Sequence, residues 1–116
     1  MTRPPAPYSP ARRAGELLFV SGQLGYLPEG RLAEGLAAQA RQALANLEEV
    51  LAGHGLSRDD VVKCQVFLSS IEDWSDFNAV YEEHFNRPYP ARSALGVRLH
   101  PGALVEIEAV AVCRTP

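Results

Sequence analysis

Residues 36–51 read LAAQARQALANLEEVL, and this stretch does most to decide the fold. Its apolar side chains recur every three or four residues, which is typical of a helix with one buried face. The stripe consists of Leu36, Ala40, Ala43, Leu44, Leu47, Val50 and Leu51. Gly53 and Gly55 follow at once and indicate where the helix ends. We therefore predict a helix over residues 36–51 that packs against another layer.

An extended arm and a hairpin are predicted before this helix. Residues 1–10 contain Pro4, Pro5, Pro7 and Pro10, which exclude a helix there. Residues 11–13 and 17–21 are strand-like and flank a tight turn at Gly15, so they predict a hairpin. We expect Gly22 to end its second strand.

Three strands and a second helix are predicted after it. Residues 61–68 alternate as a strand does, and residues 91–97 and 104–113 form two further apolar runs. Residues 71–85 place five large side chains on one helical face. These are Ile71, Trp74, Phe77, Tyr81 and Phe85.

The predicted order is β-β-α-β-α-β-β, an α+β class with two helices on one face of a sheet. The 116 residues fit a single domain over residues 1–116. Apolar residues occupy both sides of the predicted strands, so a bare second sheet face is not expected. We infer an oligomer in which the sheets of several copies pack together.

The composition of the chain indicates which classes of partner and which cellular compartment to expect. The net charge is −3 and the 11 basic residues form no run, which argues against nucleic acid. No apolar run reaches membrane-spanning length, and residues 1–10 lack the apolar core of a signal peptide. We expect a soluble cytoplasmic protein. Cys64 and Cys113 lie in apolar runs, and buried reduced thiols are favoured over a disulfide.

The charged residues inside the last two predicted strands need an explanation. Arg92 begins one strand, and Glu106 and Glu108 lie within the other. A charge in a strand is costly to bury unless it is paired or used. By alternation, the two glutamates share a face with Val110 and Val112. The pattern leaves two interpretations open, an ion pair between subunits and a ligand site.

Other chemistry finds little support in the chain. His54, His84 and His100 form no metal-ligand spacing, so no metal and no cofactor are expected. His84 falls in the last turn of the predicted second helix, where a cation suits the helix dipole. Ser21-Gly22-Gln23 follows a buried strand, and Gly22 permits close approach of a ligand to the backbone. Taken alone, this tripeptide is a weak signal.

Seven segments, in order and spacing, resemble the RidA (YjgF) family of reactive-intermediate deaminases along nearly the whole chain. They are Pro7-Tyr8-Ser9, Phe19-Val20-Ser21-Gly22-Gln23, Gln39-Ala40-Arg41-Gln42-Ala43-Leu44-Ala45-Asn46-Leu47, Asp60-Val61-Val62-Lys63, Phe77-Asn78-Ala79-Val80-Tyr81, Pro90-Ala91-Arg92-Ser93-Ala94 and Val105-Glu106-Ile107-Glu108-Ala109.

The resemblance implies a fold and an activity. The fold would be chorismate-mutase-like, with a mixed sheet forming a barrel in a homotrimer and ligand clefts between subunits. The activity would be hydrolysis of enamines and imines, of the 2-aminoacrylate and 2-iminopropanoate type, to 2-oxo acids and ammonia. Neither a cofactor nor a metal would be needed.

The resemblance also implies roles for five residues. Arg92 would bind the substrate carboxylate through a bidentate fork, and Glu106 would orient or activate the attacking water. Tyr8 would close the pocket, while Ser21 and the backbone of Gly22 would contact the substrate. Glu108 stays unassigned.

Three departures from the family pattern affect this transfer. Ala94 stands where many members have cysteine, Pro10 where glutamine is common, and Leu99-His100-Pro101 where a Leu-Pro turn is usual. The first is compatible with a water-based mechanism, and the other two bear on substrate range. Two alternatives remain: a non-catalytic protein that binds or senses 2-oxo acids, and a ribonuclease or chaperone-like protein. The acidic net charge argues against RNA.

Overall fold

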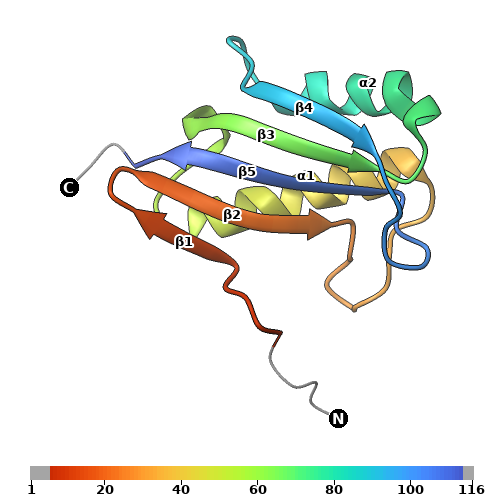
Figure 1. The fold of residues 1–116 in the computed structure, drawn as a ribbon, viewed down its shortest axis with the longest axis horizontal. Helices are drawn as coiled ribbons and strands as arrows, with labels where there is room; N and C mark the ends of the chain where they lie inside the picture. Colours follow the sequence, from red (N-terminus) through yellow and green to blue (C-terminus); the bar gives the residue numbers. More distant parts are fainter. Residues whose placement is uncertain (1–5, 114–116) are drawn as a thin grey trace.

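A computed structural model describes residues 6–113 and shows the predicted order of strands and helices (Figure 1). Short 3₁₀ turns at Arg58–Asp60 and Ile71–Asp73 precede β3 and α2. The elements are β1 (Ala11–Ala14), β2 (Leu17–Leu24), α1 (Leu36–Ala52), β3 (Val61–Leu68), α2 (Trp74–His84), β4 (Ala91–Gly96) and β5 (Val105–Val112).

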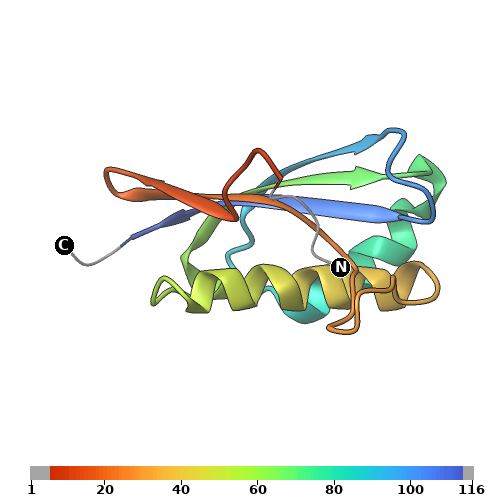
Figure 2. The same ribbon diagram turned by 90° about the horizontal axis from the view of Figure 1, so that it is seen from below.

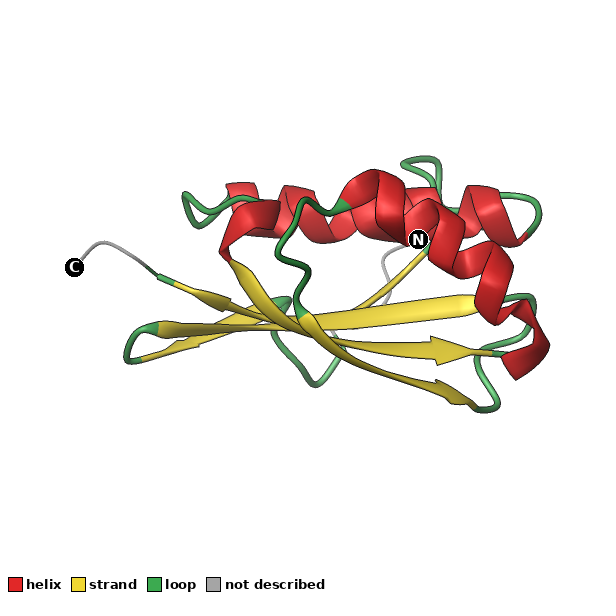
Figure 3. Cartoon of the chain, turned by 90° about the horizontal axis from the view of Figure 1, so that it is seen from above, coloured by secondary structure: helices red, strands yellow, loops and turns green. Residues whose placement is uncertain are grey.

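The five strands form one mixed sheet in the order β1-β2-β5-β3-β4. Only β3 and β4 pair in parallel, and the other neighbours are antiparallel. Both helices lie on the same face of the sheet (Figures 2 and 3). The predicted α+β class, with two helices on one face of a mixed sheet, is confirmed.

The core lies between that face and the helices. Alternate residues of β2, β3 and β5 point into it and meet the apolar stripe of α1. In β5 the buried residues are Val105, Ile107, Ala109 and Ala111, as the alternation predicts. Glu106, Glu108, Val110 and Val112 therefore face away from the helices.

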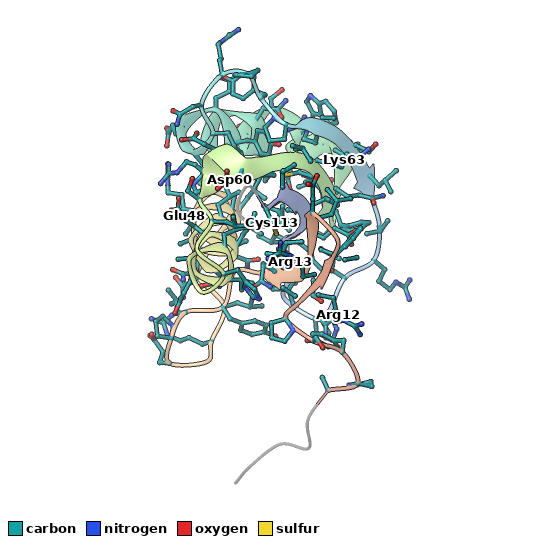
Figure 4. All side chains as sticks on the ribbon, turned by 90° about the vertical axis from the view of Figure 1, so that its left-hand side faces the viewer. Arg12, Arg13, Glu48, Asp60, Lys63 and Cys113 are labelled. Carbon is teal, nitrogen blue, oxygen red and sulfur yellow. The ribbon has the colours of Figure 1, made fainter. Side chains whose placement is uncertain are left out.

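No helix of residues 6–113 covers the opposite face of the sheet. Figure 4 shows α1, which carries Glu48, on one side, with Lys63 toward the other. Leu17 and Phe19 of β2 and Leu95 of β4 remain exposed there. Exposed apolar side chains of this size support the prediction of an oligomer, which stays a prediction.

The prediction that Gly22 ends a strand is wrong. β2 continues to Leu24 and changes register against β5 between Val20 and Gln23. An extra residue in one strand produces such a bulge and lets pairing resume beyond it. The bulge places Gly22 within the sheet, opposite the side chain of Glu106.

The second helix is shorter than predicted. Residues 71–73 form a 3₁₀ turn, α2 begins at Trp74, and Phe85 is already extended. Ile71 and Trp74 are 48% and 42% exposed, so only the later aromatic residues of the predicted stripe are buried. Sequence spacing identified the face correctly, but the start of the helix projects past the edge of the core.

His84 lies in the last turn of α2, as predicted, but it is poorly suited to be a cation. Burial lowers the pKa of its imidazole, and the nearby Arg58 charge lowers it further, while Glu48 acts in the opposite direction. Arg58 bonds to both carboxylate oxygens of Glu48, at 2.6 and 2.9 Å, and donates to the His84 carbonyl at 2.7 Å. The helix end is therefore held by an arginine and not by a charged histidine.

The two cysteines are free, as predicted. Cys64 is fully buried, whereas Cys113 is only half-buried because it lies just past the end of β5. Burial raises the pKa of the Cys64 thiol to about 11, against a smaller lowering by the Arg92 charge. The thiol is consequently neutral at pH 7 and is no nucleophile.

Gln39 ties α1 to the turn before β5 and is only 3% exposed. Its amide nitrogen donates to the Gly102 carbonyl at 3.0 Å, and its amide oxygen accepts from the Leu104 amide at 2.8 Å. We expect Gln39→Leu to lower the free energy of unfolding by about 2–4 kcal/mol, because it leaves two partly buried backbone groups without their hydrogen-bond partners. Urea denaturation measures this effect.

Gln42→Leu is the matched control, since that half-buried amide only bonds to Asn46 on the same helix, at 2.9 Å. We expect this control to cost less than about 1 kcal/mol. Equal losses in the two variants would contradict the role given to Gln39.

Candidate functional site

A cavity of about 480 Å³ lies on the face of the sheet away from the helices. Four predicted site residues line it: Tyr8, Ser21, Gly22 and Glu106. Glu108 and His100, neither of which was assigned a role, line it as well. The structure thus brings together every predicted site residue except Arg92.

Gly22 gives Glu106 its place in this cavity. A Cβ atom on Gly22 would overlap Oε2 of Glu106 and would lie only 2.8 Å from its Cδ. The Glu106 side chain therefore lies directly over the glycine of the neighbouring strand. The bulge in β2 and the missing side chain together create the space for this carboxylate.

Ser21 anchors the arm that carries Tyr8. Its hydroxyl donates to the Ser9 carbonyl at 2.6 Å, and its amide donates to the Pro10 carbonyl at 2.9 Å. Tyr8 is 68% exposed at the mouth of the cavity. In this chain the arm occupies both the hydroxyl and the amide of Ser21, so the predicted contact with substrate requires Ser21 to rearrange.

Arg92 lies on the other face of the sheet. It is paired in register with the buried Cys64, which places its side chain on the helix side of edge strand β4. Its Cζ atom is 4.7 Å from the ring centroid of Tyr81, 5.0 Å from that of Trp74 and 5.8 Å from that of Phe77. Beside it is a second cavity, of about 230 Å³.

Arg92 and Glu106 therefore do not form a joint site within one chain. One lies under α2 at the β4 edge, and the other lies on the uncovered face of central strand β5. A ligand that contacts both needs the edge of one copy beside the uncovered face of another. The alternation of residues 91–97 could not reveal this, because apolar and polar residues occur on both of its faces.

Three aromatic rings surround Arg92, and the sequence predicted them only as part of one helical face. Trp74, Phe77 and Tyr81 recur at helical spacing, which is the usual signal of a buried stripe. The exposed position of Trp74 at the start of α2 distinguishes it from an ordinary core residue. The guanidinium of Arg92 on the facing strand β4 was the second feature in the sequence that could have indicated a site here.

Two other features, a cluster of metal ligands and a membrane-spanning helix, are absent from the part of the chain that the structure describes. Within residues 6–113, no three side chains of histidine, cysteine, aspartate or glutamate come close enough to hold a metal ion. In the same range, no helix has the length and apolar character needed to cross a membrane.

Comparison with known proteins agrees with this architecture. A family model described as Endoribonuclease L-PSP matches residues 1–113. Similar proteins include a 2-iminobutanoate/2-iminopropanoate deaminase of Bos taurus, 44% identical over 109 residues, which cover 91% of this chain and 80% of the relative. Protein HMF1 of Saccharomyces cerevisiae is 40% identical over 111 residues, or 94% of this chain and 86% of the relative.

Solved structures are similar over the same range. The crystal structure of RidA from the Antarctic bacterium Psychrobacter sp. PAMC 21119 superposes with a TM-score of 0.89 at 39% identity, covering 92% of this chain and 89% of the other. That of the YjgF gene product from E. coli gives a TM-score of 0.86 at 39% identity, with coverage of 93% and 89%.

Proposed function

Because this chain belongs to the YjgF/RidA family, whose model is described as Endoribonuclease L-PSP, we propose that it hydrolyses small imines and their enamine tautomers. The products would be a 2-oxo acid and ammonia. Relatives named 2-iminobutanoate/2-iminopropanoate deaminase, at 40–44% identity, support this activity.

The observation that carries the proposal is a pair of cavities, one lined by Arg92 and the other by Glu106. Among residues 6–113, none forms a hydrogen bond or ion pair with Arg92, so its guanidinium is available to a carboxylate. Glu106 supplies a carboxylate at the other cavity, where a water molecule would be activated. An imino acid needs both groups, one for its anion and one for the attacking water.

The chemistry is a simple addition and elimination. Glu106 accepts a proton from water as the oxygen adds to the imine carbon, and that proton then passes to the imine nitrogen. Glu106 then carries the hydroxyl proton of the resulting carbinolamine to its amino nitrogen, the carbon–nitrogen bond breaks, ammonia leaves and the carbonyl of the 2-oxo acid forms. Because an imine carbon is already electrophilic, positioning and proton transfer are sufficient.

We place the complete site at the seam between two copies, with Arg92 from one and Glu106 from its neighbour. The support is their position on opposite faces of one sheet and the exposed apolar face that a second copy would cover. A homotrimer with three such seams fits what the family resemblance implies.

Release of 2-oxo acid from freshly generated 2-iminopropanoate tests the activity. The chain should exceed the buffer rate, and Arg92→Ala should not. A rate equal to that of buffer would exclude the deaminase. Tight binding of pyruvate without turnover would then favour the 2-oxo-acid-binding alternative.

Mixing two inactive variants tests the seam. When Arg92→Ala and Glu106→Gln chains are unfolded and refolded together in equal amounts, about a quarter of the seams should combine both intact groups. Activity should therefore return in the mixture, although neither variant is active alone. Failure of the mixture to regain activity, with assembly intact by light scattering, would place both groups in a single subunit or outside the site.

Ribonuclease activity, which the family description names, finds less support in this chain. The sequence carries 14 acidic against 11 basic residues, and the cavity with Glu106 adds Glu108 at its wall. Carboxylates there would repel phosphates. A purified sample with no RNA cleavage above background would agree with this reasoning.

A further inference from the structure

The side chain of Arg92 lies along one face of α2, which runs beside β4 (Figure 1). Trp74, Phe77 and Tyr81, which we call the aromatic platform, recur at three- and four-residue spacing and so share that face. Two of the rings also contact each other, with the centroids of Phe77 and Tyr81 5.6 Å apart. The guanidinium is thus held by three ring contacts from one helix.

The platform differs from the usual partner of a buried arginine. A carboxylate would occupy the N–H donors and cancel the charge that a substrate anion needs. Aromatic rings instead attract the cation through their faces and accept no in-plane hydrogen bonds from it. Within residues 6–113 the donors of Arg92 have no other partner, and the 230 Å³ cavity opens beside them.

We propose that Trp74 is a positioning residue for carboxylate recognition. This proposal rests on the proposed function. With Tyr81, it fixes the plane of the Arg92 guanidinium so that the free N–H edge meets the carboxylate of a 2-imino acid. A lysine or a mobile arginine would have to be ordered by each substrate that binds. The aromatic platform holds the Arg92 guanidinium in this orientation before any substrate binds.

The three rings differ in what else they do. Phe77 and Tyr81 are almost completely buried and belong to the core, so changing them would disturb packing. The Tyr81 hydroxyl is buried near Cys64 without a well-formed hydrogen bond in the described structure, and burial raises its pKa. Trp74 is 42% exposed and can be changed with little effect on the core.

A purely structural role predicts a different outcome. Long arginine side chains also cover apolar surface on a neighbouring helix without binding any ligand. In that case, replacing Trp74 would change stability and leave substrate affinity unaltered. Affinity and stability must therefore be measured separately.

Trp74 is the only tryptophan of the chain, so its emission reports on the platform directly. We expect pyruvate to change this emission saturably, because a carboxylate bound to Arg92 alters the field at the indole. Pyruvamide, which has the same size but no carboxylate, should leave it unchanged, and so should pyruvate added to Arg92→Lys. An unchanged emission with pyruvate, whether or not calorimetry detects binding, would overturn the proposal.

Kinetics give the second test. Trp74→Leu should raise KM for 2-iminopropanoate about 3–30-fold with kcat within about twofold of wild type, because one cation–π contact is lost. Trp74→Phe should restore most of the affinity. Ile71→Ala, at a similarly exposed site one turn earlier, is the control and should keep KM unchanged.

The outcomes separate this proposal from the activity it rests on. If wild type hydrolyses the imine and Trp74→Leu keeps its KM, the platform role is wrong and the deaminase stands. The platform role is equally wrong if Ile71→Ala raises KM as much as Trp74→Leu does. If wild type releases no pyruvate from the imine, yet pyruvate changes Trp74 emission only when Arg92 is present, the deaminase fails and the platform stands as part of a binding site.

Discussion

Arg92→Lys is expected to lower kcat/KM for 2-iminopropanoate about 100-fold or more, a loss of about 3 kcal/mol in transition-state stabilisation. Lysine keeps the positive charge but loses the planar fork, and it cannot lie flat over the rings of Trp74 and Tyr81. Steady-state rates of 2-oxo acid release at several substrate concentrations measure the change.

Arg87→Lys is the matched control for this substitution. Arg87 also lies over an aromatic ring, with its Cζ 5.2 Å from the centroid of Tyr89, but it contacts none of the platform rings. We expect its kcat/KM to stay within about twofold of wild type. If Arg92→Lys were as active as this control, bidentate recognition of the carboxylate would be excluded.

The second large effect is expected from Gly22→Ala. The added methyl group would overlap Oε2 of Glu106, so the carboxylate must leave its place over the strand. Since Glu106 is proposed to activate water, we expect kcat to fall about 100-fold. Stability should change by less than about 1 kcal/mol, because Glu106 is partly exposed and its side chain can swing away.

The control for this variant is Gly53→Ala, which adds the same methyl group at ordinary contact distance, 3.4 Å from the nearest atom. Neither glycine has a positive φ, so neither substitution strains the backbone. Activity measured beside thermal unfolding distinguishes a displaced carboxylate from a damaged fold. Full activity in Gly22→Ala would mean that the observed position of Glu106 has no role in catalysis.

Sequence periodicity predicted the elements that carry strong, uninterrupted patterns. The stripe over residues 36–51 matches α1 to within one residue, and the alternation of residues 105–112 separates the buried face of β5 from the glutamates. These predictions succeed because burial acts on every residue of a long element and leaves a regular mark. The predicted grouping of Tyr8, Ser21 and Gly22 with Glu106 came from the family resemblance and agrees with one cavity.

Bulges and long-range contacts could not be predicted in the same way. A register shift between Val61 and Lys63 turns Val62 outward, although simple alternation predicts it beside Cys64. The shift in β2 is of the same kind, since one extra residue changes every face after it and leaves no compositional signal. The contact between Trp74 and Arg92 joins a helix to an edge strand, so it depends on packing that local spacing does not encode.

The position of β5 has a consequence for how the chain acquires its fold during synthesis. β5 is the last of these five strands to leave the ribosome, yet it pairs with both β2 and β3 and so joins the hairpin to the parallel pair. Until residues 105–112 emerge, no strand is available to join β2 to β3, so the two halves of the sheet cannot pair as they do in the native fold. Such pairing between distant segments is slow to form, so we expect the native sheet to close only after translation of its final strand.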